Sequence, residues 1–271
     1  MGPIRRRGVV VVVAALAAFT TPLAGLAQAA DRLRGEYGTV WVTNRTLHNV
    51  TAFDAGTGEV VATIPVGNAP IGVVAPLMTG KVYTSDERSN QVSVISRVTR
   101  SRITTIPVGP LPHHMMASMQ GDRVYVAEFG SNTVGVIDTA TDTKVATFAA
   151  SPEARARTHA VWPSPDGRRV YATNEVTNDI AAIDTTTGAL LWNLPVGNRP
   201  SEILVTPDGR TAYVSVRNED KVKEVDLTVP RLTGREANVG RQPDTLQLTP
   251  DQRTLVVALR GTPAQVSFVN V

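Results

Sequence analysis

The stretch GDRVYVAEFGSNTVGVID, residues Gly121–Asp138, decides the fold of this 271-residue chain. It contains two runs of β-branched, aromatic and small residues, Val124–Ala127 and Val134–Ile137, separated by a polar loop with Gly130 and Asn132. Two such runs joined by a short glycine-containing loop are typical of a β-hairpin. The stretch therefore predicts two neighbouring antiparallel strands.

Copies of this hairpin recur along the chain. The clearest are GKVYTSDERSNQVSVIS at residues 80–96 and GRRVYATNEVTNDIAAID at residues 167–184, and weaker copies begin at residues 38 and 209. Successive copies lie 42 to 46 residues apart, measured between the equivalent positions Trp41, Tyr83, Tyr125, Tyr171, Tyr213 and Val256. A regular period of this length predicts a repeat architecture.

Each complete repeat contains four short strand candidates, A to D. In the repeat that holds the opening stretch, they are His114–Ala117, Arg123–Ala127, Thr133–Asp138 and Lys144–Ala149. Segments such as Pro-Asp-Gly and Asp-Thr-Thr-Thr-Gly, which favour tight turns, separate neighbouring candidates. Four antiparallel strands repeated about every 40–45 residues predict the blades of a β-propeller. A β-sandwich is the alternative, but it does not require such self-similarity.

The segment VYATNEVTNDIAAIDTTTG, followed by LPVGNRP and TPDGRTAYV, resembles the YVTN-repeat family of β-propellers. The resemblance covers about residues 37–271 and implies an all-β propeller of four-stranded antiparallel blades. The candidates number twenty-two, which encodes five to six blades. Members of the family often have seven, so three possibilities stay open: an incompletely closed ring, closure through a partner subunit, or blades that this sequence lacks.

The first thirty residues predict a signal peptide, and residues 31–271 a single propeller domain. Arg5, Arg6 and Arg7 precede the apolar run Val9–Phe19, and Ala27-Gln28-Ala29 supplies a small-x-small cleavage pattern. The run is shorter than the roughly 20 residues that span a membrane, although an uncleaved anchor is the alternative. We therefore expect an exported protein, periplasmic or extracellular, that contacts a membrane only through this segment before cleavage.

Composition excludes several classes of function. The chain has 27 basic and 24 acidic residues, but three of the basic ones lie in the predicted signal peptide, which leaves a mature chain without net formal charge. No basic cluster with interleaved aromatic residues occurs, so the sequence predicts no nucleic-acid partner. With no cysteine, disulfides, thiolate metal sites and c-type haem attachment are excluded.

All four histidines are expected on one face of the disc. The connections between repeats and the loops from strand B to strand C share this face, because neighbouring strands are antiparallel. The candidate ligand-binding residues on it are His113, His114, Glu128, Arg157, His159, Glu175, Glu202 and Asp244, whereas His48 lies farther out. For any one of them a solvated surface role is the simpler alternative. Their clustering points to a small molecule or a protein bound at the mouth of the channel.

A second resemblance covers residues 111–176. The segments LPHHMMASMQGDRVYVAEFGSNTV and RTHAVWPSPDGRRVYATNEV are similar to two consecutive blades of the seven-bladed propeller lactonases. Those carry a Pro-His-x-His-like segment, an Asp-Leu-Gly, an Arg-His and an Asn-Glu. The matching residues here are His113 or His114, Glu128-Phe129-Gly130, His159 and Asn174-Glu175. The chain departs from this pattern in three ways. Thr158 stands directly before His159, where the family has arginine, and Arg157 lies one place earlier. Glu128 replaces the aspartate, and no residue separates His113 from His114.

Three functional hypotheses follow. The absence of a complete catalytic set favours a non-catalytic exported propeller that binds a ligand through the histidine-bearing face. The first alternative is a lactonase-like hydrolase, in which His159 or Glu175 activates water and Arg157 binds a carboxylate. The second is a metal or redox-cofactor site built from His113, His159 and Glu128, because histidine with carboxylate suits a metal ion. A metal ion is the one cofactor that these residues suggest.

Overall fold

The computed structural model describes residues 38–271, so the predicted signal peptide at residues 1–30 lies outside the described residues. Within residues 38–271 the chain forms twenty-two strands and two single-turn 3-10 helices. No helix in this range is long and apolar enough to cross a membrane. The strands form six antiparallel sheets, which confirms the prediction of an all-β propeller with five to six blades.

Three-stranded sheets stand at the two ends of the chain and four-stranded sheets between them. The first sheet consists of β1 (Thr39–Asn44), β2 (Asn49–Asp54) and β3 (Val60–Pro65). The second consists of β4 (Pro70–Val74), β5 (Lys81–Asp86), β6 (Gln91–Ser96) and β7 (Arg102–Pro107), with the 3-10 helix η1 (Glu87–Ser89) between β5 and β6. The third consists of β8 (Pro112–Ala117), β9 (Arg123–Glu128), β10 (Thr133–Asp138) and β11 (Thr143–Ala149).

The remaining sheets repeat this order. The fourth consists of β12 (Thr158–Pro163), β13 (Arg169–Asn174), β14 (Asp179–Asp184) and β15 (Leu190–Pro195). The fifth consists of β16 (Pro200–Val205), β17 (Thr211–Val216), β18 (Lys221–Asp226) and β19 (Arg231–Asn238), with η2 (Arg217–Glu219) after β17. The sixth consists of β20 (Pro243–Leu248), β21 (Thr254–Leu259) and β22 (Gln265–Asn270).

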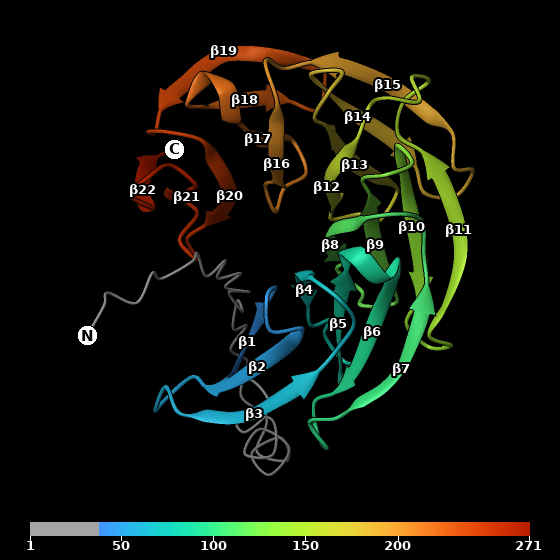
Figure 1. Ribbon diagram of the computed structural model, residues 1–271. Helices are drawn as coiled ribbons and strands as arrows, with labels where there is room; N and C mark the ends of the chain where they lie inside the picture. Colours follow the sequence, from blue (N-terminus) through green and yellow to red (C-terminus); the bar gives the residue numbers. More distant parts are fainter. Residues whose placement is uncertain (1–37) are drawn as a thin grey trace, which may run out of the picture.

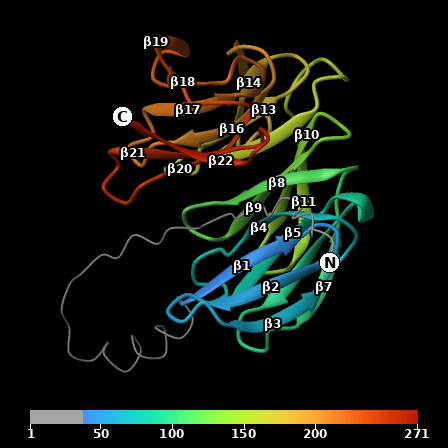
Figure 2. The same cartoon turned by 60° about the vertical axis from the view of Figure 1, so that its left-hand side comes forward.

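The sheets follow one another around an arc (Figure 1), and Figure 2 shows the same arc from a second direction. The first strands of the second to sixth sheets, β4, β8, β12, β16 and β20, form its inner wall, and each contacts the next. Outer strands such as β11 and β15 lie at the rim. The order from inside to outside is therefore strands A, B, C and D.

Apolar side chains between neighbouring sheets form the core. Tyr125 and Val134 of the third sheet pack with Val161 and Ala172 of the fourth in one buried cluster. Met115 belongs to a comparable cluster between the second and third sheets. Since the second to fifth sheets bury both faces against their neighbours, the blade scaffold leaves little freedom to the residues at their strand ends.

Every inner strand begins with a distortion of its ladder. In β8, Pro112 pairs with Glu128 and the regular register resumes only at Met115, so His113 and His114 lie in an irregular, bulge-like step. The corresponding steps lie at the starts of β4, β12, β16 and β20. A bulge leaves residues unpaired and redirects their side chains. It thereby frees the beginning of each inner strand to face the centre of the arc.

Candidate functional site

Most of the candidate residues occupy these distorted steps. His113 and His114 lie in the step of β8, His159 in that of β12, Glu202 in that of β16 and Asp244 in that of β20. The residue before each of these strands has a left-handed backbone, with φ between 52° and 59° at Leu111, Arg157, Arg199 and Gln242. This shared geometry brings the equivalent side chains of successive sheets together.

A second set of side chains comes from the residues that follow the B strands. The amide of Glu175 donates to the Arg157 carbonyl at 3.0 Å, and the amide of Arg217 donates to the Arg199 carbonyl at 2.9 Å. Phe129 and Arg260 are held in the same way by Leu111 and Gln242. This repeated backbone bond anchors the start of each inner strand beside the end of its neighbour in the same sheet.

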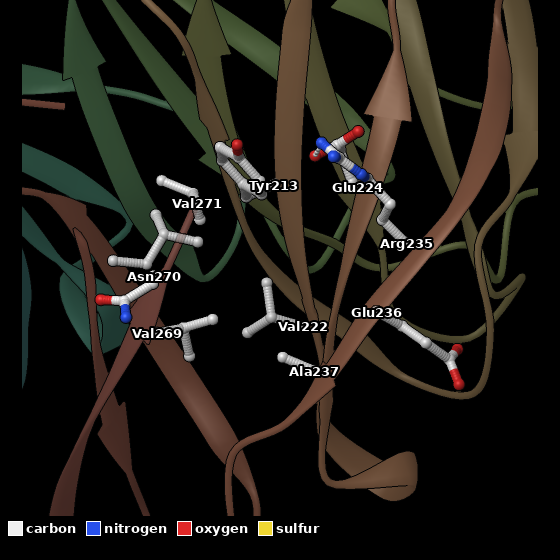
Figure 3. Close-up of a pocket in the computed structure, with 10 residues that line it drawn as sticks. Tyr213, Val222, Glu224, Arg235, Glu236, Ala237, Val269, Asn270 and Val271 are labelled. Carbon is white, nitrogen blue, oxygen red and sulfur yellow. Dashed lines mark ion pairs between the residues drawn. The ribbon is translucent and has the colours of Figure 1, made fainter. Parts of the chain in front are cut away.

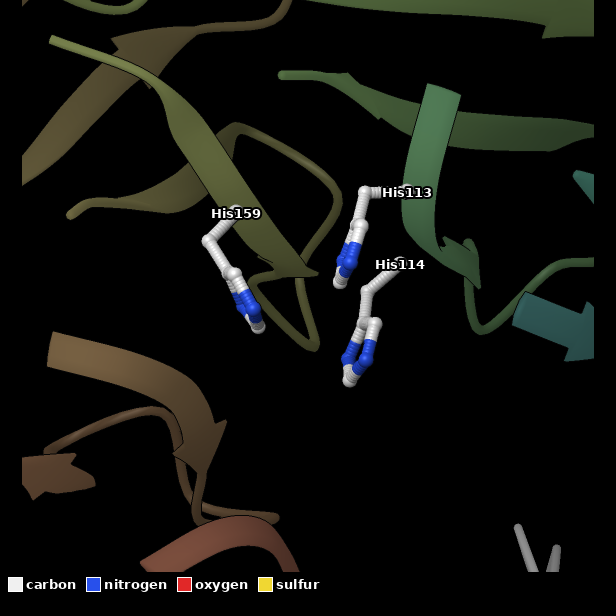
Figure 4. A group of neighbouring side chains, drawn as sticks. All are labelled: His113, His114 and His159. Carbon is white, nitrogen blue, oxygen red and sulfur yellow. The ribbon is translucent and has the colours of Figure 1, made fainter. Parts of the chain in front are cut away.

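Three histidines meet where β8 and β12 begin (Figure 4). The ring centroids of His113 and His159 lie 4.2 Å apart, and those of His114 and His159 lie 5.1 Å apart. His113 and His114 stack at 4.9 Å with an angle of 9° between their planes. His159 is buried, whereas His113 and His114 are partly exposed. We call these three residues the histidine cluster.

A buried ion-pair network borders the histidine cluster. Arg217, 7% exposed, donates to Asp244 at 2.5 Å and to Nε2 of His159 at 3.1 Å. A second guanidinium nitrogen of Arg217 lies 3.6 Å from Glu175, which Arg199 also contacts. Arg260 lies 3.4 Å from the other oxygen of Asp244. Two carboxylates therefore share three arginines at the inner edge of the fourth to sixth sheets.

The environments of the three rings differ. Burial lowers the pKa of His113 well below its ordinary 6.5, and the neighbouring His159 and His114 lower it further. Burial, His114 and Arg217 likewise lower the pKa of His159. Burial also disfavours the charged form of His114, but its hydrogen bond to Glu202 at 2.7 Å and the charge of that carboxylate raise its pKa overall. The surroundings thus favour the neutral form of His113 and His159 and the charged form of His114.

One buried ring nitrogen of the histidine cluster has no hydrogen-bond partner among the described residues. Nδ1 of His159 donates to the Ser201 carbonyl at 2.8 Å, and Nδ1 of His114 donates to Glu202. Nδ1 of His113, in contrast, is buried without a hydrogen bond from any residue of 38–271. Buried polar atoms normally have partners, so an orphaned one indicates a missing ligand, water or ion.

The structure does not bring Glu128 to the histidine cluster. Its carboxylate accepts hydrogen bonds from Lys144 and the Gly109 amide, both at 2.7 Å, and from Thr133 at 2.6 Å. Glu128 is the last residue of β9, and the next residue, Phe129, points to the histidines instead. Because successive side chains of a strand alternate in direction, the shift of one position turns Glu128 into the interior of its own blade.

Two other expected residues lie at the edge of the site. Arg157 is exposed, and its guanidinium lies 5.2 Å from the centroid of the Phe129 ring, which in turn packs 5.6 Å from that of His113. His48, in the loop between β1 and β2, accepts a hydrogen bond from the Ala69 amide at 3.1 Å. His48 therefore lies on the expected face, but it contacts the residue before β4 and is not part of the histidine cluster.

Sequence reasoning missed Arg199, Arg217 and Arg260. The repeat contained the signal for two of them, because Arg217 and Arg260 follow Tyr213 and Val256 by four residues, just as Glu175 follows Tyr171. Aligning the repeats by position, rather than searching for histidine and carboxylate, finds this ring of side chains. The pairing of Arg199 with Glu175 depends on how two sheets pack and has no such signal.

Two hollows on the described surface lie elsewhere. One, of about 270 Å³, opens between the fifth and sixth sheets and is lined by residues such as Tyr213, Glu224, Arg235 and Val269 (Figure 3). The other, of about 290 Å³, is lined by turn residues including Ser118 and Gly167. Neither is lined by a histidine. The histidine cluster, with its titratable and orphaned groups, is the site with chemistry, since perturbed groups concentrate at functional sites.

Chemically, this arrangement offers a base, an acid and a set of cations. His113 has a free ring nitrogen, His114 is held toward its charged form by Glu202, and the arginines carry fixed positive charge. Pairs of groups whose environments push their pKa values apart are suited to acid–base catalysis. Three imidazoles so close together are equally able to ligate a metal ion.

The comparisons with known proteins converge on propellers. Residues 107–270 match the model of a family described as lactonase, 7-bladed beta-propeller. This range contains the histidine cluster and the whole ion-pair network. No curated protein sequence matches the chain.

Solved structures match over most of the chain. Hydrazine synthase of Kuenenia stuttgartiensis has a TM-score of 0.75 at 23% identity, over 87% of this chain and 74% of that one. A functionally unknown protein from Desulfotomaculum acetoxidans DSM 771 also has a TM-score of 0.75, at 16% identity, over 88% and 80%. A putative 6-phosphogluconolactonase from Bacteroides uniformis ATCC 8492 has a TM-score of 0.67 at 20% identity, over 84% and 74%. Identities this low support the fold alone.

Proposed function

Because the chain belongs to the family described as lactonase, 7-bladed beta-propeller, we propose that it hydrolyses a lactone that carries a carboxylate or phosphate. The site is the histidine cluster with its surrounding arginines. The observation that carries the proposal is the buried, unpartnered Nδ1 of His113 next to the His114–Glu202 pair. An unused acceptor beside a polarised donor is what ester hydrolysis requires.

In the proposed reaction, His113 acts as the general base. Its Nδ1 takes a proton from a water molecule as the water oxygen forms a bond to the lactone carbonyl carbon. The ring C–O bond then breaks, and the departing alkoxide receives a proton from the imidazolium of His113 or His114. The product is the open hydroxy acid, so one water is consumed and no oxidant or reductant is needed.

His114 stabilises the negative charge that develops on the carbonyl oxygen. Glu202 accepts a hydrogen bond from its Nδ1 and favours the imidazolium form, and in that form Nε2 also carries a proton that it donates toward the substrate. Glu202 is 6% exposed, and in such a shielded position a preoriented donor stabilises an oxyanion more than it would in water. Removal of a single donor of this kind typically lowers kcat about 100-fold to 1000-fold.

The anionic group of the substrate is assigned to the arginines. Arg157, Arg199 and Arg260 are exposed around the histidine cluster, while Arg217 is buried next to it. Against these four cations stand three carboxylates, those of Glu175, Glu202 and Asp244. The excess positive charge favours an anionic ligand, and a guanidinium binds carboxylate or phosphate through paired hydrogen bonds.

The test is turnover of paired lactones that differ only in an added carboxylate or phosphate, followed by acid release. We expect the charged member of each pair to be hydrolysed faster, His113→Ala to abolish turnover, and Arg260→Ala to raise KM for the charged lactone alone. His48→Ala, which removes a histidine outside the cluster, is the matched control. Absence of turnover across a panel of sugar and acyl lactones would overturn the proposal.

Binding without turnover is the second candidate function. Its supporting observation is that the terminal nitrogens of Arg217 are already engaged by Asp244, His159 and Glu175. A site neutralised in this way can recognise an anionic small molecule or a protein without chemistry. Calorimetry with the same charged lactones separates the two candidates, because heat of binding without acid release supports the scaffold.

A further inference from the structure

We propose that His113, His114 and His159 bind one divalent transition-metal ion where β8 and β12 begin. The inference goes beyond the proposed hydrolysis and does not depend on it. It also differs from the sequence-based metal hypothesis, in which Glu128 stands where His114 does here.

The spacing of the rings fits a single ion. One nitrogen from each of the three histidines lies within 4.8 Å of the other two. A zinc–imidazole bond is about 2.0–2.1 Å long, so two nitrogens of a tetrahedral site stand about 3.3–3.4 Å apart. Rotations of the side chains that close the widest pair by up to about 1.4 Å would therefore bring all three nitrogens onto one ion.

Two of the rings have the supporting contacts that metal-binding histidines normally have. Nδ1 of His114 donates to the Glu202 carboxylate, and Nδ1 of His159 donates to the Ser201 carbonyl. Such partners fix the orientation of a ligand ring and direct the lone pair of the opposite nitrogen, Nε2, toward the metal. Ser201 and Glu202 both belong to β16, so the fifth sheet orients ligands that come from the third and fourth sheets.

The third ring supplies an independent observation. The buried Nδ1 of His113 has no hydrogen-bond partner among residues 38–271, although buried polar atoms rarely lack one. An ion bound by the cluster accounts for it, either by taking this lone pair directly or by turning the ring to use Nε2. The ring of His113 also packs against that of Phe129.

Arg217 opposes the ion. Its guanidinium donates to Nε2 of His159, and an ion that uses this nitrogen must replace that hydrogen bond. Asp244 and Glu175 remain as partners for the displaced arginine. Metal binding should therefore be tighter in a variant that lacks the Arg217 charge. If Arg217 only supported the structure of the site, its loss would weaken metal binding instead.

The chemistry of the donors selects the ion. Three imidazoles without a carboxylate suit zinc, copper, nickel and cobalt, whereas magnesium and calcium prefer oxygen ligands. Through either ring nitrogen, an ion at this position would hold His113, the residue that the proposed hydrolysis needs as its base. Metal and lactone should then compete, so the ion is expected to inhibit rather than to activate.

The experiment is titration of Co²⁺ into protein that has no histidine tag and has been treated with chelator, followed by visible absorption and calorimetry. We expect one equivalent to bind, at least tenfold more weakly in His113→Ala and in His114→Ala, unchanged in His48→Ala, and more tightly in Arg217→Gln. Calcium should give no heat. Thermal unfolding of each variant shows whether it is folded. Because His113 and His114 are both partly exposed, their replacement by alanine gives two separate tests of the site.

The proposal is overturned if the wild-type protein binds no Co²⁺, or if His113→Ala and His114→Ala bind it as the wild type does. Neither outcome requires a substrate. A protein that binds metal but hydrolyses no lactone would support the metal site and contradict the proposed function. A protein that hydrolyses lactones but binds no metal would support the proposed function and contradict the metal site.

Discussion

Nε2 of His159 accepts a hydrogen bond from Arg217 at 3.1 Å, although the two residues come from different sheets and from different positions of the repeat. His159 lies in the distorted start of β12, whereas Arg217 follows β17. A guanidinium can only donate, so this contact fixes Nε2 as an acceptor, and the Ser201 carbonyl fixes Nδ1 as the donor. The ring is therefore held as one neutral tautomer at the junction of the histidine cluster and the ion pairs.

Replacing Arg217 should destabilise the protein. In Arg217→Gln the buried Asp244 loses its 2.5 Å contact, and an uncompensated buried charge costs about 3–5 kcal/mol. We expect a loss of about 3 kcal/mol in the free energy of unfolding in urea, since Arg260 still lies near Asp244. Arg260→Gln is the matched control, because its side chain is 46% exposed and the expected loss is below about 1 kcal/mol. Equal losses in both variants would contradict this account of the network.

Glu128 should matter for stability and not for the site. Its side chain is 1% exposed and paired with Lys144, so Glu128→Gln should lower the free energy of unfolding by about 2 kcal/mol, the value typical of hydrogen bonds to charged groups. The same variant should bind Co²⁺ and turn over lactones as the wild type does. Weaker Co²⁺ binding in Glu128→Gln would contradict this prediction and show that the carboxylate takes part in metal binding.

The fold could be predicted from the sequence because the same hairpin pattern recurs along the chain. Each copy of the hairpin independently indicates the same two strands, and the conformation of the turns depends on nearby Asp, Pro and Gly residues. Asp138, for example, accepts hydrogen bonds from the Ala140 and Thr141 amides directly after β10. Such local interactions are visible in a linear pattern.

The site was predictable only in part. The histidines and Glu175 stood out as departures from the repeat, and the antiparallel order of strands placed them on one face. The direction of a side chain at the end of a strand depends on a single residue of register, which is why Glu128 was expected at the centre and lies inside its blade. The bulge-like step at His113 and His114 recurs at the start of every inner strand, but the alternation of side chains along a strand does not predict it.

Asp86 gives a pH dependence with a definite sign. It is fully buried at the end of β5, and burial raises its pKa above the ordinary 3.8, although hydrogen bonds from Ser93, Gln91 and the Gly67 amide act in the opposite direction. The folded protein therefore holds this proton to higher pH than the unfolded chain does. The contribution of Asp86 to stability then falls as the pH rises from below 3.8 through its folded pKa.

Asp86→Asn removes this titration, and the equivalent position of the fourth sheet is already an asparagine, Asn174. We expect the variant to be more stable than the wild type at pH 7, with the difference shrinking as the pH falls toward about 4. Urea unfolding of both proteins across this range is the measurement. A difference that stays constant with pH would assign the effect to packing instead of proton binding.

Phe268 tests whether the end of the arc is covered in solution. It lies on β22 opposite Val256 and is 72% exposed, whereas Phe148 on β11 is 9% exposed and belongs to the core between the third and fourth sheets. Phe148→Ala should lower the free energy of unfolding by about 3–5 kcal/mol, the typical result of emptying a core position. Phe268→Ala should change it by less than about 0.5 kcal/mol, as for other surface substitutions. If both variants lose the same stability, another segment or a second copy of the chain must pack on β22, and size-exclusion chromatography of Phe268→Ala would distinguish a lost dimer from a lost internal contact.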